Sequence, residues 1–396
     1  MNGLHPRQCR HPQPGHTPSP ECLGAIANAE LDLHYLAEGA ANVIYSVSVL
    51  PSPSSALQEH SHCCVMRLRK DVPSTKPIVQ VVSDFETRTS PLFRHVDTDT
   101  DDTENASSLL LTQRLYKLTP SMVESLNVEL HEMEEDTLPG SSSPDTKTDR
   151  RLPPRPHHRR NKYLPSYEQE QYGVLMQNLQ GPGVDWLIEF KPKWLVQSPS
   201  APGNAKTCRT CALNAMRRSS NESHQGRGDS GFCPLDLLEQ GGDELDRALT
   251  KIWPSDLDQD GLPGFVAQFK DRVQPALYHL RRLQREHGAV GIDDFRKRSV
   301  AEAETENLGV AMALRDCSCF VALKKSRVDH DIGGDDDDDD DDDGVDIIDV
   351  KFADLDLKTT KGGKLEKWAA MEQDLLDGGW YTRSDLGCLL SRSHKS

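Results

Sequence analysis

Alternating apolar and polar residues occupy 31–36 and 43–49, and a turn of small residues, Glu38-Gly39-Ala40-Ala41-Asn42, lies between them. This pattern predicts a β-hairpin, and the alternating stretch 64–70 predicts the strand that follows it. Small side chains at such a tip let backbone N–H groups approach phosphate groups, and Arg67 on the next strand is the cation that would reach the same phosphates. The alternative is an ordinary hairpin with exposed arginines.

Polar residues dominate from 119 to 162, where an acidic half is followed by a basic, proline-rich block that starts at Arg150. We expect a solvated linker or a flap here, and we favour it over a nuclear-import signal or a nucleic-acid patch. Shorter patterns predict a helix from Glu86 that ends at Ser90-Pro91, a strand over the apolar run 107–112, and a helix over 167–180.

The stretch 188–195 reads Ile-Glu-Phe-Lys-Pro-Lys-Trp-Leu, which predicts a short buried strand that ends in two lysines locked around a proline. The rest of the chain predicts further helices and strands. Helical patterns cover 208–218, 232–238, 244–252, 265–286 and 365–376, and strand patterns cover 319–323 and 345–353.

With 396 residues the chain is long enough for two domains or lobes, while 36% hydrophobic residues and 25 prolines indicate an ordered core with long loops. The formal net charge is −17, but twelve aspartates lie between Asp331 and Asp349, which leaves only −5 for the remainder. That remainder can still hold a basic pocket for an anionic substrate. The run of nine aspartates at 335–343 repels itself and predicts a disordered loop.

Ten cysteines are present, and the first twenty residues contain no apolar signal core, so we expect reduced thiols rather than a disulfide framework. Cys208, Cys211 and Cys233, with His224 as a candidate fourth ligand, could hold a structural Zn²⁺ ion, and buried free thiols are the alternative. No apolar run reaches the length of a membrane span, and we expect a monomer in the cytosol or the nucleus.

Seven short motifs follow one another along the chain. They are Glu38-Gly39-Ala40-Ala41-Asn42, Val65-Met66-Arg67, Ser90-Pro91-Leu92, Glu189-Phe190-Lys191-Pro192-Lys193, Cys233-Pro234-Leu235-Asp236-Leu237, Arg315-Asp316-Cys317-Ser318 and Asp354-Leu355-Asp356-Leu357-Lys358. Each is weak alone, but the ordered set resembles the inositol-pentakisphosphate 2-kinase family over roughly Glu38 to Trp380. The long insertions favour a fungal member of that family.

This resemblance implies transfer of the γ-phosphate of ATP to the 2-hydroxyl of inositol 1,3,4,5,6-pentakisphosphate, which gives inositol hexakisphosphate (phytate). It also implies an α+β, two-lobed inositol-phosphate-kinase fold that is distantly similar to protein kinases and has disordered insertions. The expected divisions are a disordered N-terminus (1–22), an N-lobe (23–118), a linker or flap (119–165), and a C-lobe (166–396) with a disordered acidic loop (326–344).

The resemblance also implies roles for particular residues. Asp316 matches the aspartate that accepts the proton of the substrate hydroxyl, and Lys191 matches a lysine at the transferred phosphoryl group. Asp354 matches a Mg²⁺ ligand, and Asp356 is a second candidate because alternate residues of an extended chain share a face. Candidates for binding substrate phosphates are Lys193, Arg209, Arg217, Arg218, Lys358 and either Lys361 or Lys364, and candidates for ATP binding are Gly39, Ala40, Ala41, Asn42 and Arg67.

Two positions depart from the family pattern. Thr359 stands where the family usually has proline, and no basic residue lies near the start of the helix predicted at Glu244, where Arg247 comes only later. These departures keep two alternatives open: a catalytically weak relative that binds inositol phosphates, or an acidic nuclear interaction protein that uses the aspartate run and the basic block.

Overall fold

The structure is a computed structural model, and the chain divides in it into two compact units. The first unit comprises 1–84 and 111–182, and the second comprises 85–110 and 183–396. The structure describes residues 20–50, 61–73, 75–93, 109–135, 155–219, 231–296, 302–326, 344–360 and 363–392. The N-terminal disorder expected over 1–22 is wrong for 20–22, which belong to helix α1 (Pro20–Ile26), while 1–19 and the nine-aspartate run lie outside the described residues.

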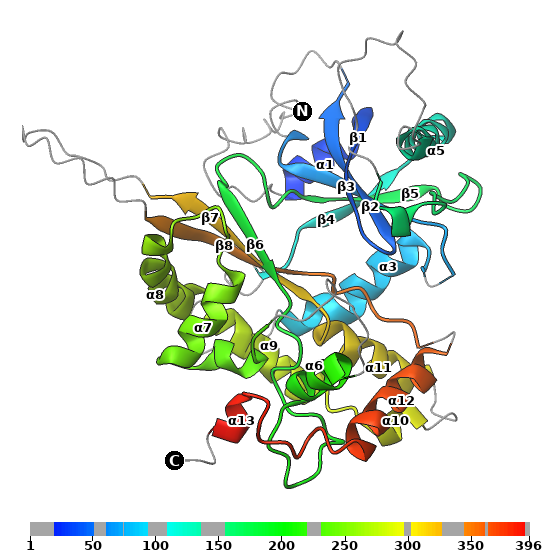
Figure 1. The fold of residues 1–396 in the computed structure, drawn as a ribbon. Coiled ribbons are helices and arrows are strands. Elements are labelled where there is room, and N and C mark those ends of the chain that lie inside the picture. The colour runs from blue at the N-terminus through cyan, green and yellow to red at the C-terminus, as the bar shows by residue number, and fades with distance from the viewer. Residues whose placement is uncertain are drawn as a thin grey trace, which may run out of the picture. The chain divides into compact units, whose positions relative to one another are not determined.

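The first unit contains a five-stranded antiparallel sheet with the strand order β1-β2-β3-β5-β4 (Figure 1). The strands are β1 (Leu31–Glu38), β2 (Asn42–Val49), β3 (Cys64–Arg69), β4 (Gln113–Lys117) and β5 (Tyr172–Gln177). The predicted hairpin and the strand after it are therefore confirmed.

The helix predicted over 167–180 is wrong, because this segment contains β5. Locally, Leu175, Met176 and Gln177 all favour a helix, but β5 lies between β3 and β4 and pairs with both. Val174 and Leu175 are fully buried as a result. Pairing with distant strands has overridden local propensity here.

Helix α5 (Pro120–Glu135) occupies much of the segment that was expected to be a polar linker. Its residues Val123, Leu126, Leu130 and Met133 are buried in one core with strands β1 to β3. These four positions are spaced by three or four residues, the period of a helix with one apolar face. The other helices of this unit are α1 (Pro20–Ile26), α3 (Ile78–Asp84) and a 3₁₀ turn (His157–Arg159).

The second unit contains an antiparallel three-stranded sheet with the order β6-β7-β8. Its strands are β6 (Trp186–Phe190), β7 (Ser318–Lys325) and β8 (Val345–Ala353), as the apolar patterns predicted. Helix α8 (Leu262–Arg272) packs against β8, and its Phe265 and Phe269 are buried in the largest hydrophobic core (Figure 1).

The predicted helices of the second unit are present with small differences. The pattern over 265–286 is divided into α8 and α9 (Gln274–His287), because Pro275 belongs to the first turn of a new helix. The remaining elements are a π-turn (Phe85–Thr89), 3₁₀ turns at Ser90–Phe93, Pro234–Leu238 and Gln259–Gly261, and the helices α6 (Arg209–Ser219), α7 (Asp243–Ile252), α10 (Ile292–Arg296), α11 (Glu302–Leu314), α12 (Lys364–Asp377) and α13 (Leu389–Arg392).

Two local predictions need correction. The helical stretch does not end at Ser90-Pro91 but continues to Phe93, since Pro91 enters the first turn of a 3₁₀ segment, where its missing N–H costs nothing. In the apolar run 107–112, Leu110 forms only a single bridge to Phe352, and β4 begins later, at Gln113. Among the described residues, no helix is long and apolar enough to cross a membrane.

The division of the chain also differs from the expected one. Residues 119–165, expected to be a linker or flap, and 166–182, expected to begin the C-lobe, belong to the first unit together with α5 and β5. The boundary between the units falls between Leu110 and Leu111, inside the apolar run. The chain is a mixed α+β protein with two separate sheets.

Candidate active site

The pairing of β6, β7 and β8 brings three motifs to one edge of the second sheet. Phe190, the last residue of β6, pairs with Cys319 near the start of β7. Ser318, the first residue of β7, pairs with Ala353 at the end of β8. The residues that follow β6, precede β7 and follow β8 are therefore neighbours in space, although they are far apart in sequence.

Five predicted residues form a lysine–aspartate cluster at this edge: Lys191, Lys193, Asp316, Asp354 and Lys358. Lys191 Nζ lies 3.0 Å from Asp354 Oδ2 and donates to the backbone oxygen of Asp316 at 2.7 Å. Lys193 Nζ lies 2.9 Å from Asp316 Oδ1. Lys358 Nζ lies 3.1 Å from Asp354 Oδ1 and 3.6 Å from Asp316 Oδ2. Each carboxylate thus contacts at least two lysines.

The cluster is open to solvent. The carboxylate side chains of Asp316 and Asp354 are 47% and 45% exposed, and those of the three lysines are 22% to 32% exposed. Ion pairs between exposed side chains stabilise a fold only weakly. Such an accessible cluster can instead exchange its partners. A phosphate group can replace a carboxylate beside the lysines, and a divalent cation can replace a lysine beside the carboxylates.

The surroundings keep the cluster charged. Burial alone would raise the pKa of Asp316, but Lys193, Lys358 and Lys191 outweigh it and hold that pKa below its usual value. Burial alone would lower the pKa of Lys358, but Asp354 and Asp316 raise it above its usual value. The negative charge of Asp356 also raises the pKa of Lys358. Asp316 is therefore ionised at neutral pH, as a general base must be.

Two cluster residues have a backbone conformation that side chains other than glycine rarely adopt. Lys193 has a φ of 55° and Asp354 a φ of 56°. Such left-handed residues cost about 1–3 kcal/mol each and gather at functional sites, where the surrounding structure enforces them. They lie in the segments that follow β6 and β8, where the Lys193 side chain pairs with Asp316 and the Asp354 side chain pairs with Lys191 and Lys358.

Gln284 of α9 holds the turn after β6 in place, and no sequence pattern predicted this role. Its buried side chain donates to the backbone oxygens of Lys193 at 2.8 Å and of Leu314 at 2.9 Å. It also accepts from the backbone N–H of Leu195 at 2.9 Å. One amide thereby joins the turn after β6 to the end of α11, just before Asp316.

Trp194, in the same turn, is packed against two arginine side chains. It is 3% exposed, and the guanidinium groups of Arg315 and Arg209 lie 3.6 Å and 4.6 Å from the ring centroid. Arg209 also pairs with the buried Glu372 at 2.6 Å. Arg209, expected to bind substrate phosphate, therefore lies in a buried structural pair and not in the lysine–aspartate cluster.

The small-residue turn in the first unit is closed by a hydrogen bond from Gly39 N to Asn42 O at 2.8 Å. Arg67, predicted to reach phosphates beside this turn, is only 9% exposed within β3. The cation that contacts the turn is Lys70, which sequence reasoning missed. Its ammonium group donates to Gly39 O at 2.9 Å and pairs with Glu38.

A buried charge network anchors this turn. Arg155 donates two hydrogen bonds of 2.9 Å to the Glu38 carboxylate and pairs with Glu134 of α5. Burial alone would raise the pKa of Glu38, but Arg155 and Lys70 hold it below its usual value. The expected flap therefore contains, at Arg155, a fixed internal anchor.

Among the described residues, Arg217 and the three predicted cysteines are not members of the lysine–aspartate cluster. Arg217 is exposed at the end of α6, and Lys361 lies outside the described residues. Cys208, Cys211 and Cys233 lie together in a small separate core with Cys388. The predicted fourth zinc ligand, His224, also lies outside the described residues.

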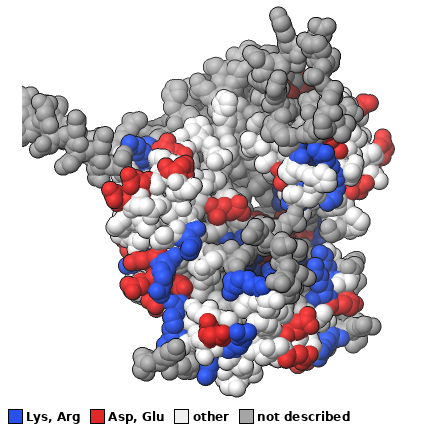
Figure 2. All heavy atoms as spheres, viewed as in Figure 1, with Lys and Arg blue, Asp and Glu red and all other residues white. Residues whose placement is uncertain are grey.

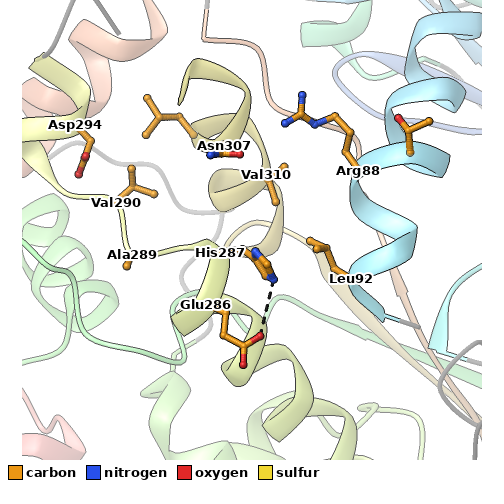
Figure 3. Close-up of a pocket in the computed structure, with 11 residues that line it drawn as sticks. Arg88, Leu92, Glu286, His287, Ala289, Val290, Asp294, Asn307 and Val310 are labelled. Atoms are coloured by element: carbon orange, nitrogen blue, oxygen red, sulfur yellow. Dashed lines mark ion pairs between the residues drawn. The ribbon is translucent and has the colours of Figure 1, made fainter. Parts of the chain in front are cut away.

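A cavity of about 480 Å³ elsewhere in the second unit is lined by none of the five cluster residues (Figure 3). Its wall includes Arg88, Glu286, His287 and Asp294, and His287 lies 3.9 Å from Glu286. Acidic and basic groups are mixed there, which does not suit a polyphosphate. Mixed charge is also the rule on the face shown in Figure 2, where acidic and basic side chains are interspersed.

Comparisons with known proteins identify the family of this chain. The sequence profile of a family described as inositol-pentakisphosphate 2-kinase matches residues 35–374. A Yarrowia lipolytica protein named inositol-pentakisphosphate 2-kinase, a phosphotransferase by that name, is 28% identical over 208 residues. The aligned part is 52% of this chain and 57% of that protein. The profile match includes all five cluster residues, and the chain belongs to the inositol-pentakisphosphate 2-kinase family.

Proposed function

We propose that this protein transfers the γ-phosphate of ATP to the 2-hydroxyl of inositol pentakisphosphate and so forms inositol hexakisphosphate. The observation that carries the proposal is the lysine–aspartate cluster, which combines an ionised base (Asp316), a carboxylate that can bind a metal ion (Asp354) and three lysines. Phosphoryl transfer requires chiefly that two anionic reactants be positioned and their charge neutralised.

Each cluster residue has a role that its contacts support. Asp316, kept ionised by its lysines, accepts the proton of the substrate hydroxyl. Lys191, which contacts both aspartates, holds the transferred phosphoryl group, and Lys193 and Lys358 hold phosphates of the inositol. Asp354 and Asp356 offer the carboxylate oxygens that Mg²⁺ prefers, and Mg²⁺ would neutralise charge on the ATP phosphates.

In the first unit, the turn Gly39–Asn42 is the candidate for covering the ATP phosphates. Its side chains are small, and a Cβ atom added at Gly39 would meet only the backbone oxygen of Asn42, at 4.0 Å. Backbone N–H groups of such a turn can approach a phosphate closely. We assign the cationic support of this turn to Lys70, which is itself fully buried and donates to the backbone oxygen of Gly39.

The test is a turnover assay with purified protein, Mg²⁺, ATP and a panel of inositol phosphates, with products separated by anion-exchange chromatography. We expect inositol hexakisphosphate from wild type. Asp354→Ala should abolish it, and Asp316→Asn should lower kcat roughly 100- to 10,000-fold, as loss of a general base does. Lys206→Met, at an exposed position away from the cluster, should behave as wild type.

A second candidate function is binding of inositol phosphates without efficient turnover. The turn contains one glycine only, and no basic residue opens α7, whose Arg247 pairs with Glu244 at 3.0 Å. If ATP and inositol pentakisphosphate both bind in calorimetry but no product forms, this second function replaces the first. If neither binds, both are rejected.

A further inference from the structure

The segment 354–358 carries three candidate ligands, Asp354 and Asp356 for Mg²⁺ and Lys358 for substrate, but it belongs to no helix or strand. A strand keeps its shape through backbone hydrogen bonds to its sheet, whereas such a segment needs partners from other elements. Two partners of this kind lie in the second unit, in parts of the chain that are distant in sequence.

The first partner is Thr89, which closes the π-turn Phe85–Thr89 and directly precedes the Ser90-Pro91-Leu92 motif, to which the proposed function gives no role. Thr89 is fully buried, and its hydroxyl donates to the backbone oxygen of Leu355 at 3.3 Å. Leu355 is also buried and lies between the two aspartates, so this bond fixes the backbone from which both carboxylates extend. Single π-turns are rare and occur frequently at functional sites.

The turn that carries Thr89 is itself fixed to the end of β8. Phe93 is fully buried, and its ring centroid lies 5.9 Å from that of Phe352 in β8. Leu110 forms a bridge to the same Phe352. Both described parts of the segment 85–110 therefore contact one residue of β8, just before the first aspartate, which gives the hydroxyl of Thr89 a firm base.

The second partner is Gly309, in the middle of α11, whose backbone oxygen accepts from the N–H of Lys358 at 3.4 Å. A Cβ atom at Gly309 would lie 2.8 Å from the backbone oxygen of Lys358, which is too close for two atoms that are not bonded. Alanine would favour the helix more than glycine does. Glycine here therefore weakens the helix but lets the backbone of the ligand segment lie directly on it.

We propose that Thr89 and Gly309 are positioning residues, which hold the segment 354–358 in the conformation that binds Mg²⁺ and substrate. Thr89 sets the position of the two aspartates through the backbone of Leu355. Gly309 sets the position of the Lys358 ammonium group through the backbone of that lysine. This inference rests on the proposed function, because the ligand roles of the segment come from there, but its test requires binding only and no turnover.

The first experiment measures binding of Mn²⁺, in place of Mg²⁺, by electron paramagnetic resonance in protein with one equivalent of a non-hydrolysable ATP analogue. Thr89→Val removes the hydroxyl and keeps the shape of the side chain, so the Kd for Mn²⁺ should rise about 3- to 10-fold, as expected for the loss of one hydrogen bond. Thr89→Ser keeps the hydroxyl and should bind Mn²⁺ as wild type does. Asp354→Ala removes a ligand and should abolish this binding.

The outcomes separate the positioning role from the proposed function. If Asp354→Ala abolishes Mn²⁺ binding and Thr89→Val leaves it unchanged, the positioning role of Thr89 is wrong while the proposed metal site stands. If Asp354→Ala binds Mn²⁺ like wild type, the metal site of the proposed function is wrong, and this inference falls with it. An equal loss in Thr89→Ser and Thr89→Val would assign the effect to packing and would also overturn the positioning role.

The second experiment measures binding of inositol pentakisphosphate by isothermal titration calorimetry. Gly309→Ala pushes the backbone of Lys358 away from α11, so the Kd should rise roughly 10-fold, as expected when a charge-assisted hydrogen bond is weakened. Gly264→Ala in α8 is the matched control and should bind as wild type does, since a Cβ atom there would meet nothing within 4 Å. A wild-type Kd in Gly309→Ala, or an equal rise in Gly264→Ala, would overturn the positioning role of Gly309.

Discussion

At the scale of single residues, Lys191 links the two carboxylates of the cluster. Its ammonium group contacts the side chain of Asp354 and the backbone oxygen of Asp316. Lys358 also contacts both carboxylates, at 3.1 Å from Asp354 and 3.6 Å from Asp316. Lys193 pairs with Asp316 at 2.9 Å, so a change at Lys193 alters the surroundings of Asp316 and leaves the two lysine partners of Asp354 in place.

This arrangement predicts a shifted pH profile for Lys193→Met. In wild type the lysines hold the pKa of Asp316 below its usual value, so the base stays ionised as the pH falls. Without Lys193 the largest opposing charge is gone, and burial raises the pKa. Asp316 then gains its proton at a higher pH, and the acid limb of kcat/KM should move to higher pH.

The measurement is kcat/KM between pH 4 and 8, with each variant normalised to its own plateau. Titration of the substrate phosphates is common to all variants and cancels in the comparison. Lys206→Met, an exposed lysine in the same unit, is the control. An acid limb that stays in place in Lys193→Met would show that Lys193 does not set the charge of Asp316.

At the scale of elements, the sequence predicted the strands around the site better than it predicted the residues that hold those strands and their turns in place. Each of the motifs after β6, before β7 and after β8 is one continuous stretch of sequence, so each could be recognised without knowledge of the fold. Gln284, Lys70 and Cys388 act through partners 31 to 180 residues away, and no local pattern marks such contacts. For the same reason β5 looked helical, because only its pairing with β3 and β4 makes it a strand.

Gln284 provides a test of this support. Gln284→Leu removes the three hydrogen bonds that join α9 to the turn after β6 and to the end of α11. Each buried group left unsatisfied should cost about 1–3 kcal/mol in the free energy of unfolding. We also expect kcat to fall more than KM rises, because the turn that aims Lys193 at Asp316 is released.

Gln268→Leu is the matched control. Gln268 of α8 makes two similar hydrogen bonds, to Val345 O at 2.7 Å and from Ile347 N at 2.8 Å, at the opposite end of β8. This variant should lose stability, measured by urea unfolding, and keep its kcat. Equal losses of kcat in both variants would mean that Gln284 acts only through global stability.

The network at Arg155 makes a similar prediction for the first unit. Arg155→Met removes the guanidinium group that pairs with both Glu38 and Glu134 and leaves Glu38 with Lys70 as its remaining cation, and breaking a buried ion pair costs about 3–5 kcal/mol. We expect a lower melting temperature and a higher KM for ATP, since Glu38 precedes the turn. Lys117→Met, at an exposed position on β4, should change neither. An unchanged melting temperature in Arg155→Met would contradict the buried anchor.

At the scale of the whole molecule, both units are assembled from pieces that are separated in sequence. The segment 85–110 belongs to the second unit although it lies between two parts of the first. Composition and spacing could not reveal this, because they describe neighbours along the chain only. The expected boundaries at 118 and 165 followed changes in polarity, whereas the observed ones follow buried contacts.

The charge of the whole molecule leads to the last prediction, for the nine aspartates at 335–343. The strands on either side are paired up to Lys325 and Val345, and Ser326 N donates to Gly344 O at 2.9 Å. Deleting the nine residues leaves this pairing and eight connecting residues, 327–334, so the hairpin should still close. The lysine–aspartate cluster lies at the opposite end of the same strands, and kcat should not change.

The association rate should change, however, because the deletion removes nine negative charges that repel an anionic substrate. At low ionic strength we expect kcat/KM to rise, and at about 1 M salt, where charges are screened beyond about 3 Å, the difference should vanish. A variant with nine serines in place of the aspartates separates charge from length and should behave like the deletion. A salt-independent fall in kcat would instead show that the aspartates act directly in catalysis, and loss of a basic protein partner with unchanged kcat would give them a role in binding.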